Sequence, residues 1–367
     1  MVIDTIRRLL VRGLGVDLGS VNTLIYARGN GIILNEPSAL AVNKFNGRVV
    51  AVGRDAVEML GREPRDVTVH RPVQSGVVVD YQLAESMIKH FLHEACGRFS
   101  SSWGLYRVLM GVPSSATHVE RRGVVNAMSR AGASRVSLID EGVAAGIGSG
   151  VLSHDARARM IVDIGGGTTN ISIVSGAGVI TSHSFSIAGI AMDHAICDFI
   201  RQEYRLLLGE QTAEAVKKSI GAALPTTDNR SYPVIAKSMS DGSPQELEIH
   251  SDEIVYALDK IVKTILNSVR LVIEEAAPEV SADLYRTGIT LAGGASLLRE
   301  MDTRFRQEFR LPASRAERPL EAVALGVGKL LDMPTMIDRF EIREDIPTWE
   351  LETAVDYTLA GRVSDAL

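Results

Sequence analysis

The sequence predicts an α/β protein made of two related domains, and three observations support this class. The chain has 367 residues, enough for two hydrophobic cores, and 46% of them are hydrophobic. A strand and turn pattern near the N-terminus recurs about 150 residues later. Apolar runs of strand length alternate with longer segments of helical spacing, which is typical of sheets covered by helices.

The repeat pairs residues 15–34, "GVDLGSVNTLIYARGNGIIL", with residues 161–181, "IVDIGGGTTNISIVSGAGVIT". Each copy reads as an apolar strand ending in Val-Asp-Leu/Ile-Gly, a small polar turn, an alternating strand, a glycine turn and a third apolar strand. A repeat at this distance predicts two domains of one plan, each beginning with a β-hairpin.

Helical periodicity follows the hairpin in both halves. Apolar residues at helical spacing predict helices over residues 82–96, 118–132 and 251–276. The runs "RVLMGVP" (107–113) and "GITLAGG" (288–294) read as buried strands that end in small residues. Strand alternating with helix predicts a largely parallel central sheet in each half, with ligand loops at the carboxyl ends of the strands.

Charge and hydropathy exclude some functions. The net charge of −6 argues against nucleic acid as a partner that would bind a broad basic surface. At 100° per residue, one arc of the N-terminal segment is apolar and the rest carries Arg7, Arg8 and Arg12; the arc holds Val2, Ile3, Ile6, Leu9 and Leu10. Such a helix either lies in a membrane interface, with its arginines near anionic lipid, or packs on the body of the protein; we favour the membrane.

Two aspartates, Asp17 and Asp163, each end a strand and precede a glycine-rich turn. Bare backbone N–H groups in such turns can approach phosphate oxygens closely. Carboxylates at this place suit a hydrated Mg²⁺, which prefers a few carboxylates, waters and phosphate oxygens. Either turn alone could be a tight hairpin, but two turns in matching positions favour a phosphate site.

A third glycine turn, "ITLAGGASLL" (289–298), follows a strand and opens a helix, a context that can place backbone against a base or ribose. The sequence has no GxxxxGK[ST] motif, since "GVGKLL" near Lys329 lacks both the spacing and the hydroxyl. The predicted phosphate site is therefore not a P-loop.

The turns "VDLGSVNTLIY", "VDIGGGTTNISIV" and "LAGGASLL" resemble the phosphate and adenosine motifs of the actin, DnaK-chaperone and sugar-kinase superfamily. Further segments, among them "GIILNEPSALAV", "LLLGEQTAEAVKKSIG" and "AVALGVGKLL", resemble the MreB family of bacterial actin-like proteins in order, over about residues 14–332. The resemblance implies an actin-like, ribonuclease H-like fold, with duplicated domains around a central cleft for ATP and Mg²⁺.

The resemblance also implies roles for individual residues. Asp17 and Asp163 would flank the metal, Asp163 through water, and Glu141 would orient the attacking water. Glu214 and Lys217 would touch ribose and adenine, although a solvated pair on one helical face is the alternative. The glycine turns would clamp the phosphates and line the adenosine; with Thr168 also implied in catalysis, these residues are Gly19, Ser20, Val21, Asn22, Gly165, Gly166, Gly167, Thr168, Gly293 and Gly294.

The chain departs from the family pattern at three places. It has Asp140-Glu141-Gly142 where the family has Glu-Glu-Pro, and we expect glycine to hold the acid less rigidly than proline. It has "AGIAMD" (188–193) for Gly-Gly-Asp-Glu-Met-Asp, and Ala-Gly-Gly-Ala in the third turn. We expect nucleotide binding to survive these changes, and hydrolysis to be the step that they affect.

The resemblance further implies filaments of the chain itself on the inner face of the cell membrane, slow ATPase activity coupled to filament turnover, and guidance of cell-wall synthesis with RodZ-like membrane proteins. Phe99 and Trp103 would add to the membrane contact, and a contact with the protein core is the alternative for each ring. The alternatives are a sugar or small-acid kinase and a plasmid- or organelle-positioning filament.

We expect the chain to divide into the following domains and segments: a membrane helix (1–13), a first core (14–36, 73–150 and 320–340) with an insertion (37–72), a second core (151–190 and 252–319) with an insertion (191–251), and a polar tail (341–367).

Overall fold

A computed structural model describes residues 13–96, 106–151, 157–176 and 178–342. Two five-stranded sheets dominate it. They have the same strand order when the first is read from β3 and the second from β13. The first, in the order β10-β9-β1-β2-β3, consists of β1 (Gly13–Leu18), β2 (Asn22–Ala27), β3 (Gly31–Pro37), β9 (Tyr106–Val112) and β10 (Ala133–Asp140). The second, in the order β13-β12-β11-β17-β18, consists of β11 (Arg159–Ile164), β12 (Thr169–Ser175), β13 (Gly178–Phe185), β17 (Ile289–Ala292) and β18 (Ala313–Arg315).

This matching order confirms the predicted hairpins, but the prediction of largely parallel sheets is wrong. In the first sheet β10, β9 and β1 run parallel, whereas β1-β2 and β2-β3 are antiparallel. The second sheet repeats this division. The reason is local: short turns join three successive strands in each copy, and a tight turn can join antiparallel strands only.

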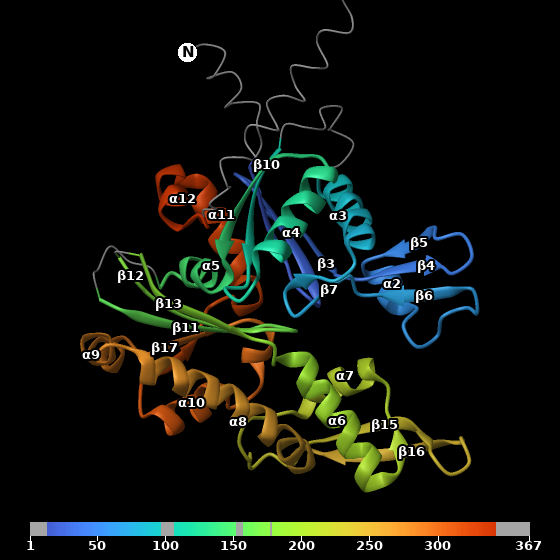
Figure 1. Cartoon of the computed structure of the whole chain (residues 1–367). Helices are drawn as coiled ribbons and strands as arrows, with labels where there is room; N and C mark the ends of the chain where they lie inside the picture. The colour runs from blue at the N-terminus through green and yellow to red at the C-terminus, as the bar shows by residue number, and fades with distance from the viewer. Residues whose placement is uncertain (1–12, 97–105, 152–156, 177, 343–367) are drawn as a thin grey trace, which may run out of the picture.

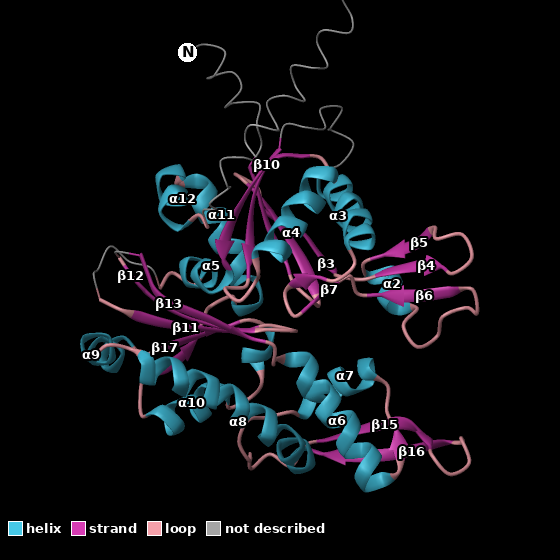
Figure 2. Cartoon of the chain, in the orientation of Figure 1, coloured by secondary structure: helices cyan, strands magenta, loops and turns pink. Residues whose placement is uncertain are grey.

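Helices cover and separate the two sheets (Figure 1). The outer face of the first sheet packs on α3 (Tyr81–Cys96) and α4 (His118–Arg130). Between the sheets lie α5 (Glu141–Gly148) and α11 (Ala322–Asp332), which share one apolar core. On the far side of the second sheet lie α8 (Ser251–Glu275), α9 (Pro278–Thr287) and α10 (Met301–Phe309), as Figure 2 shows.

The helix limits follow from local sequence signals. Thr117 caps α4, because its hydroxyl accepts from the Glu120 N–H while the Glu120 carboxylate accepts from the Thr117 N–H. The longest helix, α8, buries one stripe at spacings of three and four residues: Ile254, Leu258, Val262, Ile265, Val269 and Val272. Pro278 opens α9 at a position where its missing N–H costs nothing.

Two smaller units project beside the large sheets. The first is the sheet β5-β4-β6 with α2 (Arg54–Glu58); its strands are β4 (Leu40–Asn43), β5 (Val49–Val52) and β6 (Val67–His70). The second is the sheet β14-β15-β16 beside α6 (Gly189–Tyr204) and α7 (Glu210–Ile220); its strands are β14 (Leu206–Leu207), β15 (Ser231–Ser238) and β16 (Pro244–His250). A short pair, β7 (Val73–Gln74) and β8 (Val77–Val78), lies near the first large sheet.

The C-terminal end of the described chain returns to the first sheet. Helix α12 (Pro334–Phe340) brings Phe340 into the core between the sheets. The Ile342 N–H then donates to the Leu138 carbonyl on β10 at 2.9 Å. The domain limits that we expect from the sequence stay predictions. None of the helices among the described residues has the length and apolar character that a membrane crossing requires.

Candidate functional site

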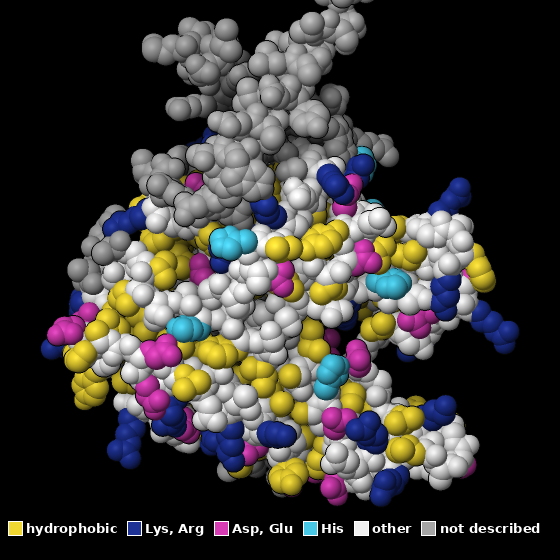
Figure 3. All heavy atoms as spheres, viewed as in Figure 1, with side chains coloured by type: hydrophobic (Ala, Val, Ile, Leu, Met, Phe, Trp, Pro, Cys, Tyr) yellow, Lys and Arg dark blue, Asp and Glu magenta, His cyan; other side chains and the backbone are white. Residues whose placement is uncertain are grey.

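A cavity of about 700 Å³ lies where the carboxyl ends of β1 and β11 meet. In the space-filling view the molecule is notched on the same side, between the two smaller units (Figure 3). Every residue from 13 onward that the sequence suggested for nucleotide, metal or catalysis lines this cavity; they are Asp17, Gly19, Ser20, Val21, Asn22, Glu141, Asp163, Gly165, Gly166, Gly167, Thr168, Glu214, Lys217, Gly293 and Gly294. The structure therefore brings five separate stretches of sequence to one site of a size that suits a small ligand.

The two repeated turns face each other directly. A Cβ on Gly166 would lie 2.2 Å from Val21 Cγ2, and a Cβ on Gly167 would lie 2.6 Å from Ser20 Oγ. Only glycine at these positions lets the second turn approach the first. The first turn is braced from outside, because Ser20 Oγ accepts from the Gly76 N–H at 3.0 Å and Ser38 Oγ donates to the Gly19 carbonyl at 2.6 Å.

The second turn is tied to the start of α6. The N–H groups of Gly189 and Ile190 donate to the carbonyls of Gly165 and Gly166 at 3.2 and 2.9 Å. Within the turn, the Gly165 N–H donates to the Thr168 carbonyl at 2.8 Å. These bonds tie the backbone of the second turn to α6 and to itself.

The third turn lies against the second. Gly293 has a φ of 78°, and a Cβ there would lie 2.3 Å from the Ile164 carbonyl oxygen and 2.6 Å from Asp163 Oδ1. After it comes a short 3₁₀ helix, η2 (Gly294–Leu297), so the turn opens a helix as the sequence suggested. Leu297 and Leu320 line the cavity beside it while each stays more than 40% exposed, which leaves apolar surface at this end of the cleft.

Three carboxylates line the cavity together: Glu141 and Asp163 are buried, and Asp17 is half-buried. Burial raises the pKa of Asp17 to about 7, with the Asp163 charge adding to it. Burial also raises the pKa of Asp163 to about 7. Burial, followed by the charges of Asp17 and Asp163, raises the pKa of Glu141 well above its usual value. Concentrated negative charge away from water favours either protons or a cation here.

The donor set fits Mg²⁺ bound with water and phosphate. Asp17 and Asp163 supply hard oxygen atoms, the kind that Mg²⁺ prefers. Among the described residues no three histidine, cysteine or acidic side chains group as they would in a metal site made by protein alone. A magnesium ion here would therefore be held by these two carboxylates together with waters and phosphate oxygens, the arrangement usual for nucleotide sites.

Glu141 is the first residue of α5, and its surroundings differ from what the sequence suggested. Glu141 Oε2 accepts from Asn170 Nδ2 at 2.8 Å, and Asp140, the helix cap, accepts from the Val143 N–H at 3.0 Å. A Cβ on Gly142 would lie only 2.0 Å from Ser172 Oγ. Ser172 thus fills the space beside the glycine, and the expectation that Gly142 holds the acid less rigidly than proline stays a prediction.

Glu214 and Lys217 do not pair with each other. Lys217 Nζ lies 2.7 Å from Asp193 Oδ1, with both side chains nearly buried, and donates to the Gly189 carbonyl at 2.9 Å. Glu214 pairs instead with Lys218, at 2.7 Å, on the exposed side of α7. Lys217 thus ties α7 to the start of α6, which in turn holds the second glycine turn.

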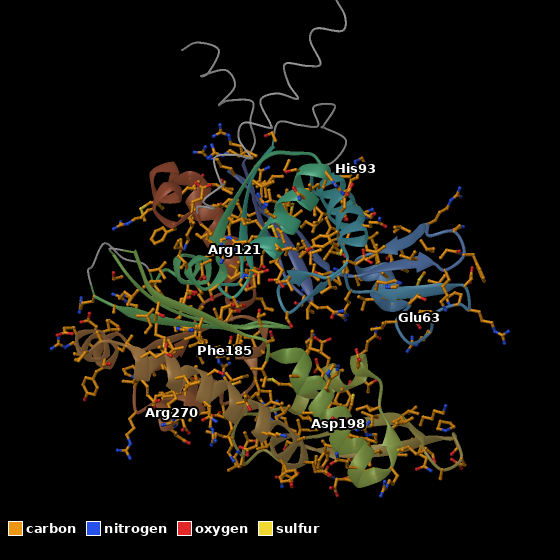
Figure 4. The ribbon with its side chains drawn as sticks, in the orientation of Figure 1. Glu63, His93, Arg121, Phe185, Asp198 and Arg270 are labelled. Carbon is orange, nitrogen blue, oxygen red and sulfur yellow. The ribbon has the colours of Figure 1, made fainter. Side chains whose placement is uncertain are left out.

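Sequence reasoning missed several residues of this site. Asp193 closes the "AGIAMD" run, and its position one helical turn into α6 was the signal that it faces the cavity. Arg299 also lines the cavity, and it donates to the Ile220 and Gly221 carbonyls at the end of α7. Asn170 gave no signal, because only its bond to Glu141 reveals it. Phe185, labelled in Figure 4, packs on the core of the second sheet. It is the last residue of β13, four residues before α6 begins.

The predicted membrane residues lie outside the described residues. These are Val2, Ile3, Ile6, Leu9 and Leu10 in the N-terminal segment, with Phe99 and Trp103 in the loop after α3. The membrane contact therefore stays a prediction.

Comparison with known proteins agrees with this architecture. The family model described as MreB/Mbl protein matches residues 11–339. The cell shape-determining protein MreB of Escherichia coli (strain K12) is 40% identical over 334 residues, covering 90% of this chain and 96% of that protein. The cell shape-determining protein Mbl of Bacillus subtilis (strain 168) is 36% identical over 326 residues, covering 88% and 97%.

Solved structures show the same fold. MreB 5 of Spiroplasma citri bound to AMPPNP superposes with a TM-score of 0.84 at 32% identity, covering 89% of this chain and 98% of that one. A MamK double helical filament gives a TM-score of 0.74 at 20% identity, covering 88% and 98%, which bears on the fold alone. The duplicated sheets around one cleft define an actin-like protein. Within that class, the chain belongs to the MreB/Mbl family.

Proposed function

We propose that this chain binds ATP with Mg²⁺ in its cleft and polymerises into filaments that lie on the inner face of the cell membrane, direct cell-wall synthesis and maintain cell shape. The observation that carries the proposal is the pair of facing glycine turns that line one cavity with the carboxylates of Asp17, Asp163 and Glu141. Support comes from the relatives named cell shape-determining proteins and from the AMPPNP and ADP complexes of MreB5.

In this proposal the turns 19–22 and 165–168 bind the phosphates through backbone N–H groups and the hydroxyls of Ser20 and Thr168. Gly293 and Gly294, with the apolar surface of Leu297 and Leu320, accept the adenosine. Glu214 stands near the ribose, while Lys217 contributes by holding the start of α6. Bound Mg²⁺ neutralises phosphate charge, and Asp17 and Asp163 hold its water shell.

Glu141 then orients a water toward the terminal phosphate, since phosphoryl transfer to water depends on positioning and charge stabilisation more than on covalent help. The resulting activity is a slow ATPase that limits filament lifetime. A kinase of the same fold would instead place an acceptor hydroxyl beside Glu141. ATP labelled in its γ-phosphate distinguishes the two: the ATPase releases free phosphate, whereas a kinase delivers the label to a metabolite from a cell extract.

Electron microscopy of the purified full chain tests the polymer. We expect filaments with ATP and Mg²⁺ and none with EDTA. Glu141→Gln should still form filaments, and they should disassemble more slowly. Absence of filaments in every nucleotide state would contradict the proposal.

The membrane part rests on residues 1–12 and is tested separately. The full chain should sediment with vesicles of anionic phospholipid in ATP, and a chain lacking Met1–Arg12 should stay in the supernatant. Leu9→Ser with Leu10→Ser should lose binding at all salt concentrations, because apolar insertion is removed. Arg7→Ala with Arg8→Ala should lose mainly the dependence on anionic lipid. Equal sedimentation of all four proteins would contradict the anchor. We expect wall-synthesis and RodZ-like membrane proteins to bind such membrane-bound filaments.

A further inference from the structure

Two polar pairs cross the β12-β13 ladder beneath the start of α5. Asn170 stands directly opposite Ser184, and Ser172 directly opposite Ser182. Asn170 and Ser172 are at most 2% exposed. Polar side chains buried to this extent need partners, because an unpaired one loses its hydrogen bonds to water without replacing them. The first pair finds its partner in Glu141, and the second in Asp140, the residue that caps α5.

The first pair forms a chain of hydrogen bonds that ends on Glu141. Ser184 Oγ donates to Asn170 Oδ1 at 2.5 Å, and Asn170 Nδ2 donates to Glu141 Oε2 at 2.8 Å. An ionised carboxylate can only accept, so the NH₂ group of Asn170 faces Glu141 and its Oδ1 is left to accept from the Ser184 hydroxyl. Glu141 and Ser184 therefore hold the orientation of Asn170 from both ends.

The second pair holds the residue before Glu141. Ser182 Oγ donates to Asp140 Oδ2 at 2.9 Å, and Ser172 Oγ lies 3.3 Å from Asp140 Oδ1. The Val143 N–H adds its bond to the same carboxylate. With Ser172 also filling the space beside Gly142, the backbone at the start of α5 is attached to β12 and β13.

This attachment joins the two large sheets. Asp140 ends β10 of the first sheet, whereas the four ladder residues belong to the second. The position of Glu141 therefore depends on the second sheet, although its helix continues directly from the first. Asn170 also hydrogen-bonds to Asp163, where the bond opposes the rise of the Asp163 pKa.

We propose that Asn170, oriented by Ser184, is the positioning residue that aims the Glu141 carboxylate at the water that attacks ATP. The inference rests on the proposed function, because it assumes that Glu141 orients that water. The donated bond immobilises one carboxylate oxygen and so fixes the direction in which the carboxylate faces the phosphate turns. A misplacement of about 1 Å at a reacting group can cost about 100-fold in rate.

Single-turnover release of phosphate from ATP by the full chain tests the proposal, with ATP affinity measured separately by displacement of a fluorescent ATP analogue. Asn170→Ala should slow release by about 10- to 100-fold and change the dissociation constant by less than about 3-fold. Asn170→Asp keeps the shape but replaces the donor with a second carboxylate, and it should be at least as slow. Ser184→Ala should slow release less, and Ser184→Thr, which keeps the hydroxyl, should restore most of the rate.

Epistasis separates positioning from a general effect on structure. Because Asn170 acts through Glu141, Asn170→Ala combined with Glu141→Gln should be no slower than Glu141→Gln alone. Ser231→Ala is the matched control, since it removes another cross-strand serine bond, to Glu248 on β16, and should release phosphate at the wild-type rate.

The failures are distinguishable. If Glu141→Gln is slow while Asn170→Ala and Asn170→Asp match the wild type, the inference is overturned and the proposed function stands. If the double variant is slower than Glu141→Gln alone by the full factor of Asn170→Ala, the two residues act independently, and the inference is likewise overturned. If Glu141→Gln releases phosphate at the wild-type rate, or the wild type releases none, the proposed role of Glu141 fails and the inference fails with it.

Discussion

The side-chain amide of Gln211 on α7 donates a hydrogen bond of 2.6 Å to the backbone carbonyl of Val57 on α2. These helices belong to the two smaller units on opposite sides of the cleft, and Val57 also lines the cavity. The bond therefore joins the two sides of the cleft mouth, where a nucleotide would enter and leave.

Removing this bond should speed nucleotide release. One hydrogen bond contributes about 0.5 to 1.5 kcal/mol, so Gln211→Ala should raise the dissociation rate of a fluorescent ATP analogue by about 2- to 10-fold in stopped-flow measurements. Gln202→Ala, an exposed glutamine on α6, is the matched control and should leave the rate as it is. An unchanged rate in Gln211→Ala would show that the closed mouth does not depend on this bond.

Gly142 should not tolerate a side chain while Ser172 is present. Alanine favours helices over glycine by about 1 kcal/mol, but its Cβ would lie 2.0 Å from Ser172 Oγ. We expect Gly142→Ala to lower the free energy of unfolding by about 1 to 3 kcal/mol in urea denaturation. Gly142→Ala with Ser172→Ala should recover part of that loss, because the hydroxyl is gone. Strict additivity of the two changes would contradict the packing described here.

The crossing of α5 and α11 should be the most sensitive point between the sheets. A Cβ on Gly326 would lie 1.8 Å from the Ala144 carbonyl oxygen, and a backbone atom cannot rotate away. Gly326→Ala should lower the free energy of unfolding by about 3 kcal/mol or more. Asp332→Asn on the same helix breaks only an exposed pair with Arg28 and should cost less than about 1 kcal/mol. Comparable losses in both variants would argue against a close crossing.

The stability of the chain without nucleotide should depend on pH through Asp17 and Asp163. Their pKa is about 7 in the folded chain, against about 4 for an unfolded aspartate. Between these values the folded chain holds protons that the unfolded chain has released, so the free energy of unfolding should fall as pH rises from about 5 to 7 and level off above.

Urea denaturation at a series of pH values checks this. Asp17→Asn and Asp163→Asn should each reduce the slope, and the double variant should keep the part that comes from Glu141, whose pKa burial also raises. Glu274→Gln, an exposed site on α8, should keep the wild-type slope. A free energy of unfolding that rises over the same range in the wild type would show that other groups outweigh this pair.

Features encoded by neighbouring residues were predictable from the sequence. Alternating apolar residues and glycine turns located both hairpins, and helical spacing located α3, α4 and α8, because periodicity and turn chemistry act over a few residues. The same local pattern occurs in both repeats, and it therefore placed Asp17 and Asp163 at equivalent strand ends. The mixture of parallel and antiparallel strands was missed. The alternation of strands with helices suggested parallel sheets, although the predicted hairpins require antiparallel pairs.

The tertiary structure alone decided which groups meet. Lys217 pairs with Asp193 instead of Glu214, Asn170 reaches Glu141, and Ile342 returns to β10. Each contact joins residues more than 20 positions apart, and its partner depends on how helices cross and sheets pack. Sequence therefore determined the elements and the chemistry of the turns. Packing determined the carboxylate cluster and its positioning, because burial and long-range hydrogen bonds exist only once the two sheets lie against the shared helices.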